Sequence, residues 1–382
     1  MASSFGPWAD LPPPASRSNP SPPSAASAPR GSLLLTVPGF DAAPLHGQLE
    51  AGARVSALPL LLNLPRAGRA YELSTLPVGG EFVGACHGWI AVNTVWPGIF
   101  LVNPLAGEGM EIGLPPLKNA DDGEPVLKVV FAPRPTTAPP TLAYIRTRDA
   151  MRGRWVLVDV AVDAPDRLAD LAYDAGAAGG GKGYCVTRCG DVHVFQIPRD
   201  RRRLRPRANP LRPRPAGEPF KPAAAFAPPY DVASRFAITN SKNVFICGGG
   251  LYQVWRRDAA TAISWTVPGG GGGTFRMPKD DVVVLKYNNN ARRRPSWDAV
   301  RDVGGCSVFV GKNNPVVLRP EDAPGVRANC VYWINERAEP MVFDMAARTS
   351  TRHPSSAMVL SPACRPLCWY FLQEKTMSVE DS

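Results

Sequence analysis

The feature that most constrains the fold is a recurring alternation of short apolar runs with breaks that contain proline or glycine. Residues 84–117 are GACHGWIAVNTVWPGIFLVNPLAGEGMEIGLPPL. The runs GWIAVNT, GIFLVN and MEIG have the length of β-strands and are too short for a stable isolated helix. Proline fixes φ and glycine accepts positive φ, so Pro97-Gly98 and Asn103-Pro104 favour turns between the runs. The segment therefore predicts a small antiparallel meander.

The same pattern continues to the end of the chain. Strand-like runs of this kind occupy residues 154–162, 183–198, 243–257, 280–288, 306–318, 329–336 and 340–347. About twenty candidate strands at short spacing favour an all-β, closed fold over alternating strands and helices. Residues 163–176 are compatible with a turn or two of helix. Because no long linker divides the chain after about Gly31, we expect a single large β domain.

Composition is consistent with a turn-rich β protein. The chain has 382 residues, 45% of them hydrophobic, with 42 prolines and 35 glycines. Residues 10–30 are rich in proline, serine and alanine without periodicity, which predicts disorder. The N-terminal residues lack the basic and apolar regions of a secretory signal, and the longest apolar stretch is broken by proline. We therefore expect no membrane association, reduced thiols, and a cytoplasmic and/or nuclear location.

Much of the formal net charge of +10 comes from one tract, RDRRRLRPRANPLRPRPAGEPFKP, at residues 199–222. We expect this tract to be a basic loop inserted in the β domain. Three roles are open for this tract: a solvated surface insertion with no further role, a nuclear-import signal, or a nucleic-acid contact. Nucleic-acid binding is the least favoured, because no aromatic residues for base stacking are interleaved with the arginines. The residues of this charge patch are Arg201, Arg202, Arg203, Arg205 and Arg207.

Several ordered motifs resemble one family of plant proteins. The closest match is GGCSVFVGKNNPVVLRPEDAPGVRANCVYWINE at residues 304–336, which is preceded by CGGGLYQVWRR at 247–257 and followed by MVFDM at 341–345 and PLCWYFL at 366–372. Together with residues 84–117, they resemble the F-box-associated KIB-type β-propeller family, over about residues 31–372. The resemblance implies a single closed β-propeller, of about six blades, with residues 373–382 as a tail.

The resemblance also implies which residues form the propeller core and how its ends meet. Tryptophans are expected to pack between blades, where each buries a large apolar area. The N-terminal strand at residues 31–37 is expected to complete the blade formed by the C-terminal residues, since open strand edges invite aggregation. The structural propeller positions are Trp89, Trp255, Tyr332, Trp333 and Phe343.

Members of this family usually begin with an F-box, a helical segment that docks a ubiquitin-ligase adaptor. Residues 8–13, WADLPP, resemble the start of an F-box, but residues 12–29 contain seven prolines. Each interior proline costs a helix about 3 kcal/mol. We therefore interpret residues 1–30 as a disordered remnant of an F-box start and expect no binding to the ligase adaptor.

Motifs for catalysis or cofactor binding are incomplete. The segment GAAGGGKGY at residues 176–184 lacks the Ser/Thr and the following helix of a phosphate-binding loop. The pairs Cys185/Cys189 and Cys364/Cys368 have a spacing of about 13 Å along a straight strand, too long to chelate zinc. His46, His87, His193 and His353 have no partner at a recognisable catalytic spacing. We therefore expect no enzyme activity, no metal and no cofactor.

Two functions of different class remain open from the sequence. The first is a non-catalytic protein-interaction propeller that resembles the substrate-binding part of an F-box ubiquitin-ligase receptor, with an unknown protein as its substrate. The alternative is a propeller that binds a small molecule or carbohydrate. An enzyme that acts on such a ligand belongs to this alternative. Acidic or histidine side chains converging at the mouth of the central channel would favour the alternative, whereas an apolar, arginine-rimmed mouth would favour the first.

Overall fold

The computed structural model of the chain describes residues 33–38, 60–63, 69–72, 81–86, 88–94, 98–103, 111–114, 126, 128–130, 143–146, 156–160, 166–174, 181–196, 207–211, 241–257, 261–266, 272–277, 282–289, 296–323, 325–335, 337, 339–353 and 364–371. These residues contain 25 strands and no helix, which confirms the all-β class. Accordingly, no helix long and apolar enough to cross a membrane occurs in them. Residues 1–30, 199–206 and 373–382 lie outside the described segments, so the expectations for them stay predictions.

Strands between residues 81 and 113 form an antiparallel sheet of four strands. Its order is β4 (Glu81–Cys86), β5 (Trp89–Thr94), β6 (Gly98–Val102) and β7 (Glu111–Gly113). Each strand pairs with the next along the chain. Gly88, in the turn between β4 and β5, has φ of 85°, a conformation that glycine adopts without steric cost. The predicted meander is confirmed.

A second sheet joins the two ends of the chain. Its order is β25 (Cys364–Tyr370), β1 (Leu33–Pro38), β2 (Leu60–Asn63) and β3 (Arg69–Glu72). β1 and β25 run antiparallel, with Leu34 opposite Trp369. This pairing confirms that the strand predicted at residues 31–37 completes the sheet of the C-terminal residues.

The third sheet has six strands and corrects two predictions. Its order is β10 (Leu168–Asp174), β11 (Lys182–Thr187), β12 (Val192–Gln196), β13 (Arg207–Pro210), β9 (Val156–Val160) and β8 (Ala143–Arg146). The helix suggested within residues 163–176 is wrong, because β10 pairs along its length with β11. The tract at 199–222 is not loop throughout, because its residues 207–210 pair with β12 and β9.

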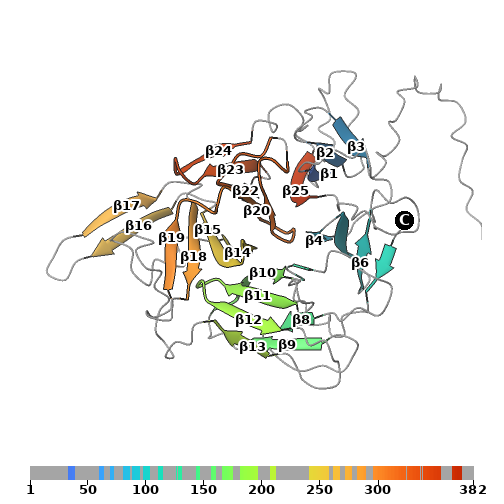
Figure 1. The fold of residues 1–382 in the computed structure, drawn as a ribbon, viewed down its shortest axis with the longest axis horizontal. Helices are drawn as coiled ribbons and strands as arrows, with labels where there is room; N and C mark the ends of the chain where they lie inside the picture. Colours follow the sequence, from blue (N-terminus) through green and yellow to red (C-terminus); the bar gives the residue numbers. More distant parts are fainter. Residues whose placement is uncertain are drawn as a thin grey trace, which may run out of the picture.

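The fourth sheet carries an outlying hairpin. The sheet order is β14 (Ser241–Cys247), β15 (Gly250–Arg256), β18 (Val282–Asn288) and β19 (Ser296–Val300). Between β15 and β18 the chain forms a separate two-stranded sheet from β16 (Thr261–Thr266) and β17 (Gly272–Met277). Figure 1 shows this hairpin extending outward from the other sheets.

The fifth sheet is built from the segment with the strongest family-like motif. Its order is β21 (Val316–Leu318), β20 (Ser307–Phe309), β22 (Cys330–Ile334), β23 (Pro340–Asp344) and β24 (Thr349–Arg352). β20 and β22 are parallel, and the other neighbours are antiparallel. A short connection, residues 310–315, joins β20 to β21.

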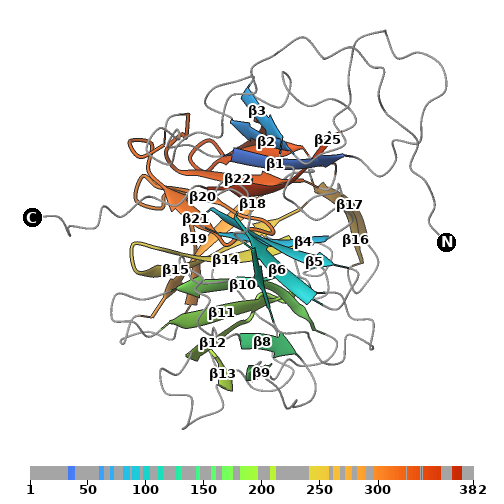
Figure 2. The same ribbon diagram turned by 90° about the vertical axis from the view of Figure 1, so that its right-hand side faces the viewer.

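Figure 1 shows the sheets arranged around a common centre, as in a β-propeller. β25 packs against both β4 and β22, and β14 packs against both β10 and β21. From the side, in Figure 2, the β4–β7 sheet lies between the sheet of β25 and β1–β3 above and the sheet of β8–β13 below. The inner strands of different sheets therefore face one another across a small central region.

The predicted number of about six blades is wrong. Among the described strands, three sheets have four strands, one has five, one has six and the last is the two-stranded hairpin. Fewer than six sheets therefore have the four or more strands of a propeller blade. The number of strands overestimates the number of blades. β8 and β9 extend the sheet of β10–β13, and β16 and β17 form a two-stranded hairpin that is too small to be a blade.

Apolar side chains fill the spaces between neighbouring sheets. One cluster joins β14, β15 and β18 to β20–β23, and includes Phe245, Val284 and Trp333. A second joins β10–β12 to β14 and β15, around Trp255. A third packs Trp369 of β25 against residues of β20 and β22. Burial of apolar surface between sheets thus positions their inner edges.

A candidate functional site at the centre of the sheets

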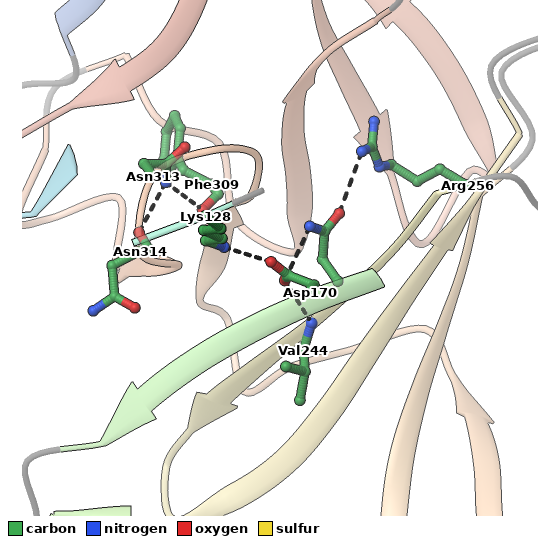
Figure 3. Close-up of polar contacts among 8 residues, drawn as sticks. Lys128, Asp170, Val244, Arg256, Phe309, Asn313 and Asn314 are labelled. Carbon is green, nitrogen blue, oxygen red and sulfur yellow. Dashed lines mark hydrogen bonds and ion pairs between the residues drawn. The ribbon is translucent and has the colours of Figure 1, made fainter. Parts of the chain in front are cut away.

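The inner strand β10 carries a buried carboxylate, Asp170, which is 6% exposed. Its Oδ1 lies 2.6 Å from Lys128 Nζ. Its Oδ2 accepts hydrogen bonds from Asn243 Nδ2 at 3.0 Å and from the backbone N–H of Val244 at 3.1 Å. Figure 3 shows Lys128 and Val244 approaching this carboxylate from opposite sides of β10. Both carboxylate oxygens are therefore used within the protein.

Lys128 reaches Asp170 from the side of the β4–β7 sheet. The neighbouring Val129 donates its backbone N–H to the carbonyl of Val83 on β4 at 2.7 Å, which holds residues 128–130 beside that strand. The side chains of Lys128 and Asp170 are 7% and 2% exposed. Buried charges are costly unless paired, so this ion pair ties the β4–β7 sheet to β10.

The polar contacts continue from β14 to two further strands. Asn243 Oδ1 accepts a hydrogen bond from Arg256 Nη2 on β15 at 3.3 Å. The guanidinium of Arg256 lies 5.7 Å from the ring centroid of Trp333 on β22, within the range of a cation–π contact. A continuous series of contacts from Lys128 to Trp333 therefore links four sheets.

The loop between β20 and β21 adds contacts from the other side of the centre. The backbone N–H of Asn314 donates to the carbonyl of Ala85 on β4 at 2.8 Å, and Lys312 Nζ lies 3.0 Å from Glu81 Oε1. Asn313 Nδ2 donates to the carbonyls of Phe309 and Asn314 at 3.2 and 2.8 Å, as Figure 3 shows. The loop thus joins the β20–β24 sheet to β4.

We call six of these residues the central polar junction: Lys128, Asp170, Asn243, Arg256, Asn313 and Asn314. Among the described residues, the buried side-chain oxygens of Asn313 and Asn314 accept no hydrogen bond. Asn314 Nδ2 donates weakly to Cys86 Sγ at 3.5 Å. The junction therefore consists of one ion pair, a guanidinium hydrogen-bonded to Asn243, and amides, with these two oxygens as its remaining acceptors.

Burial suppresses the reactivity of Cys86, Cys368 and His353. It raises the pKa of Cys86 to about 11, although the Asn314 amide and the Lys128 charge act in the opposite direction. Burial likewise raises the pKa of Cys368 to about 12. It lowers the pKa of His353 to about 4, and the charge of Arg327 acts in the same direction. These thiols are protonated at neutral pH and His353 is neutral, which is unfavourable for nucleophilic or acid–base chemistry.

The five propeller positions singled out from the sequence are all buried. The exposed fractions are 6% for Trp89, 1% each for Trp255, Tyr332 and Trp333, and 4% for Phe343. Trp255 and Trp333 lie between neighbouring sheets. Trp89 instead packs with described residues of its own sheet and the adjoining segment.

The other residues considered from the sequence do not meet at the junction. Cys185 is buried on β11 and Cys189 lies in the turn after it. Lys182 begins a strand, so the glycine-rich segment before it is not followed by a helix. The described segments contain no group of three or more His, Cys, Asp or Glu that could hold a metal ion. Arg207 begins β13, whereas Arg201, Arg202, Arg203, Arg205, His46 and His87 lie outside the described residues.

Sequence reasoning missed every residue of the central polar junction. One signal was present: Asp170 interrupts the run LADLAYD, where a charge inside a short strand requires a partner. The partner itself is not predictable from spacing, because Lys128 is 42 residues away and reaches Asp170 only through the packing of two sheets.

The arrangement of the sheets and their buried junction define a β-propeller-type protein. The family model described as KIB1-4 beta-propeller matches residues 61–352, well over half of the chain. The chain therefore belongs to the KIB1-4 beta-propeller family. A search of curated proteins found no match.

Proposed function

We propose that this chain is a non-catalytic protein-binding propeller, comparable to the substrate-binding part of an F-box ubiquitin-ligase receptor. The observation that carries the proposal is the state of Asp170, a buried acidic side chain at the centre. Lys128, Asn243 and Val244 occupy both of its oxygens. A carboxylate held in this way stabilises the contact between sheets and is not available as an acid or base for a substrate.

A closed ring is part of the same proposal. Its support is the set of contacts between successive sheets, among them β25 with β4, β10 with β14, and β22 with β25. The Tyr370 hydroxyl also donates to the carbonyl of Gly88 at 2.6 Å, which ties β25 to the turn between β4 and β5. A rigid ring would present its outer loops in fixed positions, which lowers the entropy cost of binding a protein.

The alternative, a site for a small molecule or carbohydrate, has less support. It calls for acidic or histidine side chains that converge on the channel and face a ligand. Asp170 is paired, and the loop between β20 and β21 approaches β4 through Asn314 and Lys312. These contacts favour a centre that serves as a structural connection, with recognition on the outer surface.

We also propose that residues 11–30, as they stand in the sequence, do not dock the ligase adaptor. The seven prolines between Pro12 and Pro29 are incompatible with the helical surface of an F-box. These residues would then contribute no contact with a ligase. A pull-down of purified adaptor by the purified chain tests this point, and stoichiometric, direct capture of the adaptor would contradict it.

The main experiment is affinity purification of the whole chain from a plant extract, followed by mass spectrometry and by binding measurements with each purified candidate. We expect at least one protein to bind directly and saturably. Binding or turnover of a carbohydrate or other small molecule, with no protein partner that binds the purified chain, would favour the alternative function.

A further inference from the structure

Two cysteines from neighbouring sheets lie together at the boundary between them. Cys247 is the last residue of β14, and Cys306 directly precedes β20. Both belong to the hydrophobic cluster that joins these two sheets. They are 7% and 8% exposed, so each lies just beneath the protein surface.

The contacts of the two thiols bring them close to one another. Cys247 Sγ donates to the carbonyl of Val303 at 3.5 Å, and Cys306 Sγ donates to the carbonyl of Gly304 at 3.8 Å. The Cys306 side chain also lies close enough to Cys247 to raise the pKa of its thiol. Because these two carbonyls belong to consecutive residues, the two thiols lie near one another, although 59 positions separate them in the sequence.

Two exposed glycine turns flank this pair of cysteines. Gly248 and Gly249 follow Cys247 and are exposed, and Gly304 lies exposed two residues before Cys306. An added Cβ at Gly248, Gly249 or Gly304 would meet no atom within 4 Å, so the turns are not covered by described side chains.

Burial and the nearby positive charges shift the pKa of Cys247 in opposite directions. Burial raises the pKa of Cys247 to about 11, and the neighbouring Cys306 acts in the same direction. The charges of Arg319 and Lys286 act in the opposite direction and favour the thiolate. Positive charges beside a thiol stabilise the thiolate that attacks a disulfide. The resting Cys247 thiol is thus protonated, with two cations placed to assist exchange.

We propose that Cys247 and Cys306 form a thiol-modification site that reacts with low-molecular-weight disulfides and becomes an intramolecular disulfide between the two sheets. One thiolate attacks a sulfur of the small disulfide, forms a mixed disulfide and releases one small thiol. The second thiolate attacks the protein sulfur of the mixed disulfide and releases the other small thiol. Two protein thiols are oxidised, one small disulfide is reduced to two thiols, and the product joins β14 covalently to the segment before β20.

Glutathione disulfide is a suitable probe. The folded, reduced chain is incubated with it, free thiols are blocked, and the digested protein is mapped by mass spectrometry. We expect a linked peptide containing Cys247 and Cys306, which disappears after reduction. Cys189→Ser, in a turn of the β8–β13 sheet, is the matched control and should form the link as the wild type does.

The variant Cys247→Ser separates the two steps. Because it lacks the second thiol, Cys306 should remain as a mixed disulfide with glutathione. The proposal is overturned if the wild-type protein yields Cys247 and Cys306 only as free thiols or as separate glutathione adducts. It is equally overturned if the link forms only after the protein has been unfolded.

Discussion

Replacement of Asp170 by asparagine should strongly destabilise the folded chain. The substitution keeps the shape of the side chain but removes its charge, so Lys128 Nζ loses an anionic partner 2.6 Å away. Water cannot replace that partner easily, because the side chains of Lys128 and Asp170 are 7% and 2% exposed. Removal of one member of a buried ion pair costs about 3–5 kcal/mol, and we expect Asp170→Asn to lower the free energy of unfolding by this amount.

Urea-induced unfolding, followed by tryptophan fluorescence, measures the effect. The matched control is Glu81→Gln, which removes the partner of Lys312 from an ion pair with side chains 53% and 40% exposed. An exposed pair contributes about 0–1 kcal/mol, so the control should unfold almost as the wild type does. If Asp170→Asn destabilises the chain no more than Glu81→Gln, Asp170 does not stabilise the contact between the sheets.

A double substitution distinguishes the buried charge from the other contacts of Asp170. Asp170→Leu alone should be severely destabilising, because it leaves Lys128 charged and buried. Combining it with Lys128→Met removes both charges and should restore part of the lost stability. Recovery should be incomplete, because Asn243 Nδ2 and the Val244 N–H lose their acceptor, at about 1–3 kcal/mol each. A double variant less stable than Asp170→Leu would contradict this explanation.

Three further predictions concern the packing between sheets and the response to pH. Trp333→Ala should lower the free energy of unfolding by about 3–5 kcal/mol, because the side chain is 1% exposed between two sheets; a thermal midpoint near that of the wild type would count against its position. Gly190→Ala should destabilise the chain more than Gly248→Ala in parallel thermal melts. Both glycines have positive φ, but only at Gly190 would a Cβ lie 2.2 Å from a ring carbon of Trp255, and equal midpoints would disprove the clash. Burial lowers the pKa of His353 to about 4, so protonation of this side chain favours the unfolded state. The free energy of unfolding of the wild type should therefore fall by about 3 kcal/mol as the pH decreases from about 6.5 to 4. His353→Gln should flatten that part of the pH profile, and an unchanged slope would exclude His353 as its cause.

The alternation of short apolar runs with proline and glycine breaks predicted most of the strands, because each run and its flanking turns lie close together in the sequence. The segment 243–257 illustrates this point: two apolar runs flank Gly248-Gly249, and both glycines have positive φ in the turn between β14 and β15. The pairing of β1 with β25 was also predictable, because a strand near the start of the chain needs a partner. Each of these predictions depends on one segment and one general requirement of sheets.

The errors arise where packing between distant segments decides the structure. Residues 168–174 contain leucine, alanine and aspartate and are compatible with a helix, but pairing with β11 and the contacts of Asp170 favour a strand. The basic tract contributes β13 because backbone hydrogen bonds to β12 and β9 do not require apolar side chains. The central polar junction was not predictable for the same reason, since its residues come from segments far apart in the chain.

The central claim is that the propeller binds a protein partner directly. Isothermal titration calorimetry with the purified chain and the partner recovered by affinity purification tests it. The account predicts saturable binding at a fixed stoichiometry, unchanged in Glu81→Gln, the exposed ion-pair control. A partner that gives no heat and no complex with the purified chain, together with saturable binding of a carbohydrate or other small molecule by the same preparation, would contradict it.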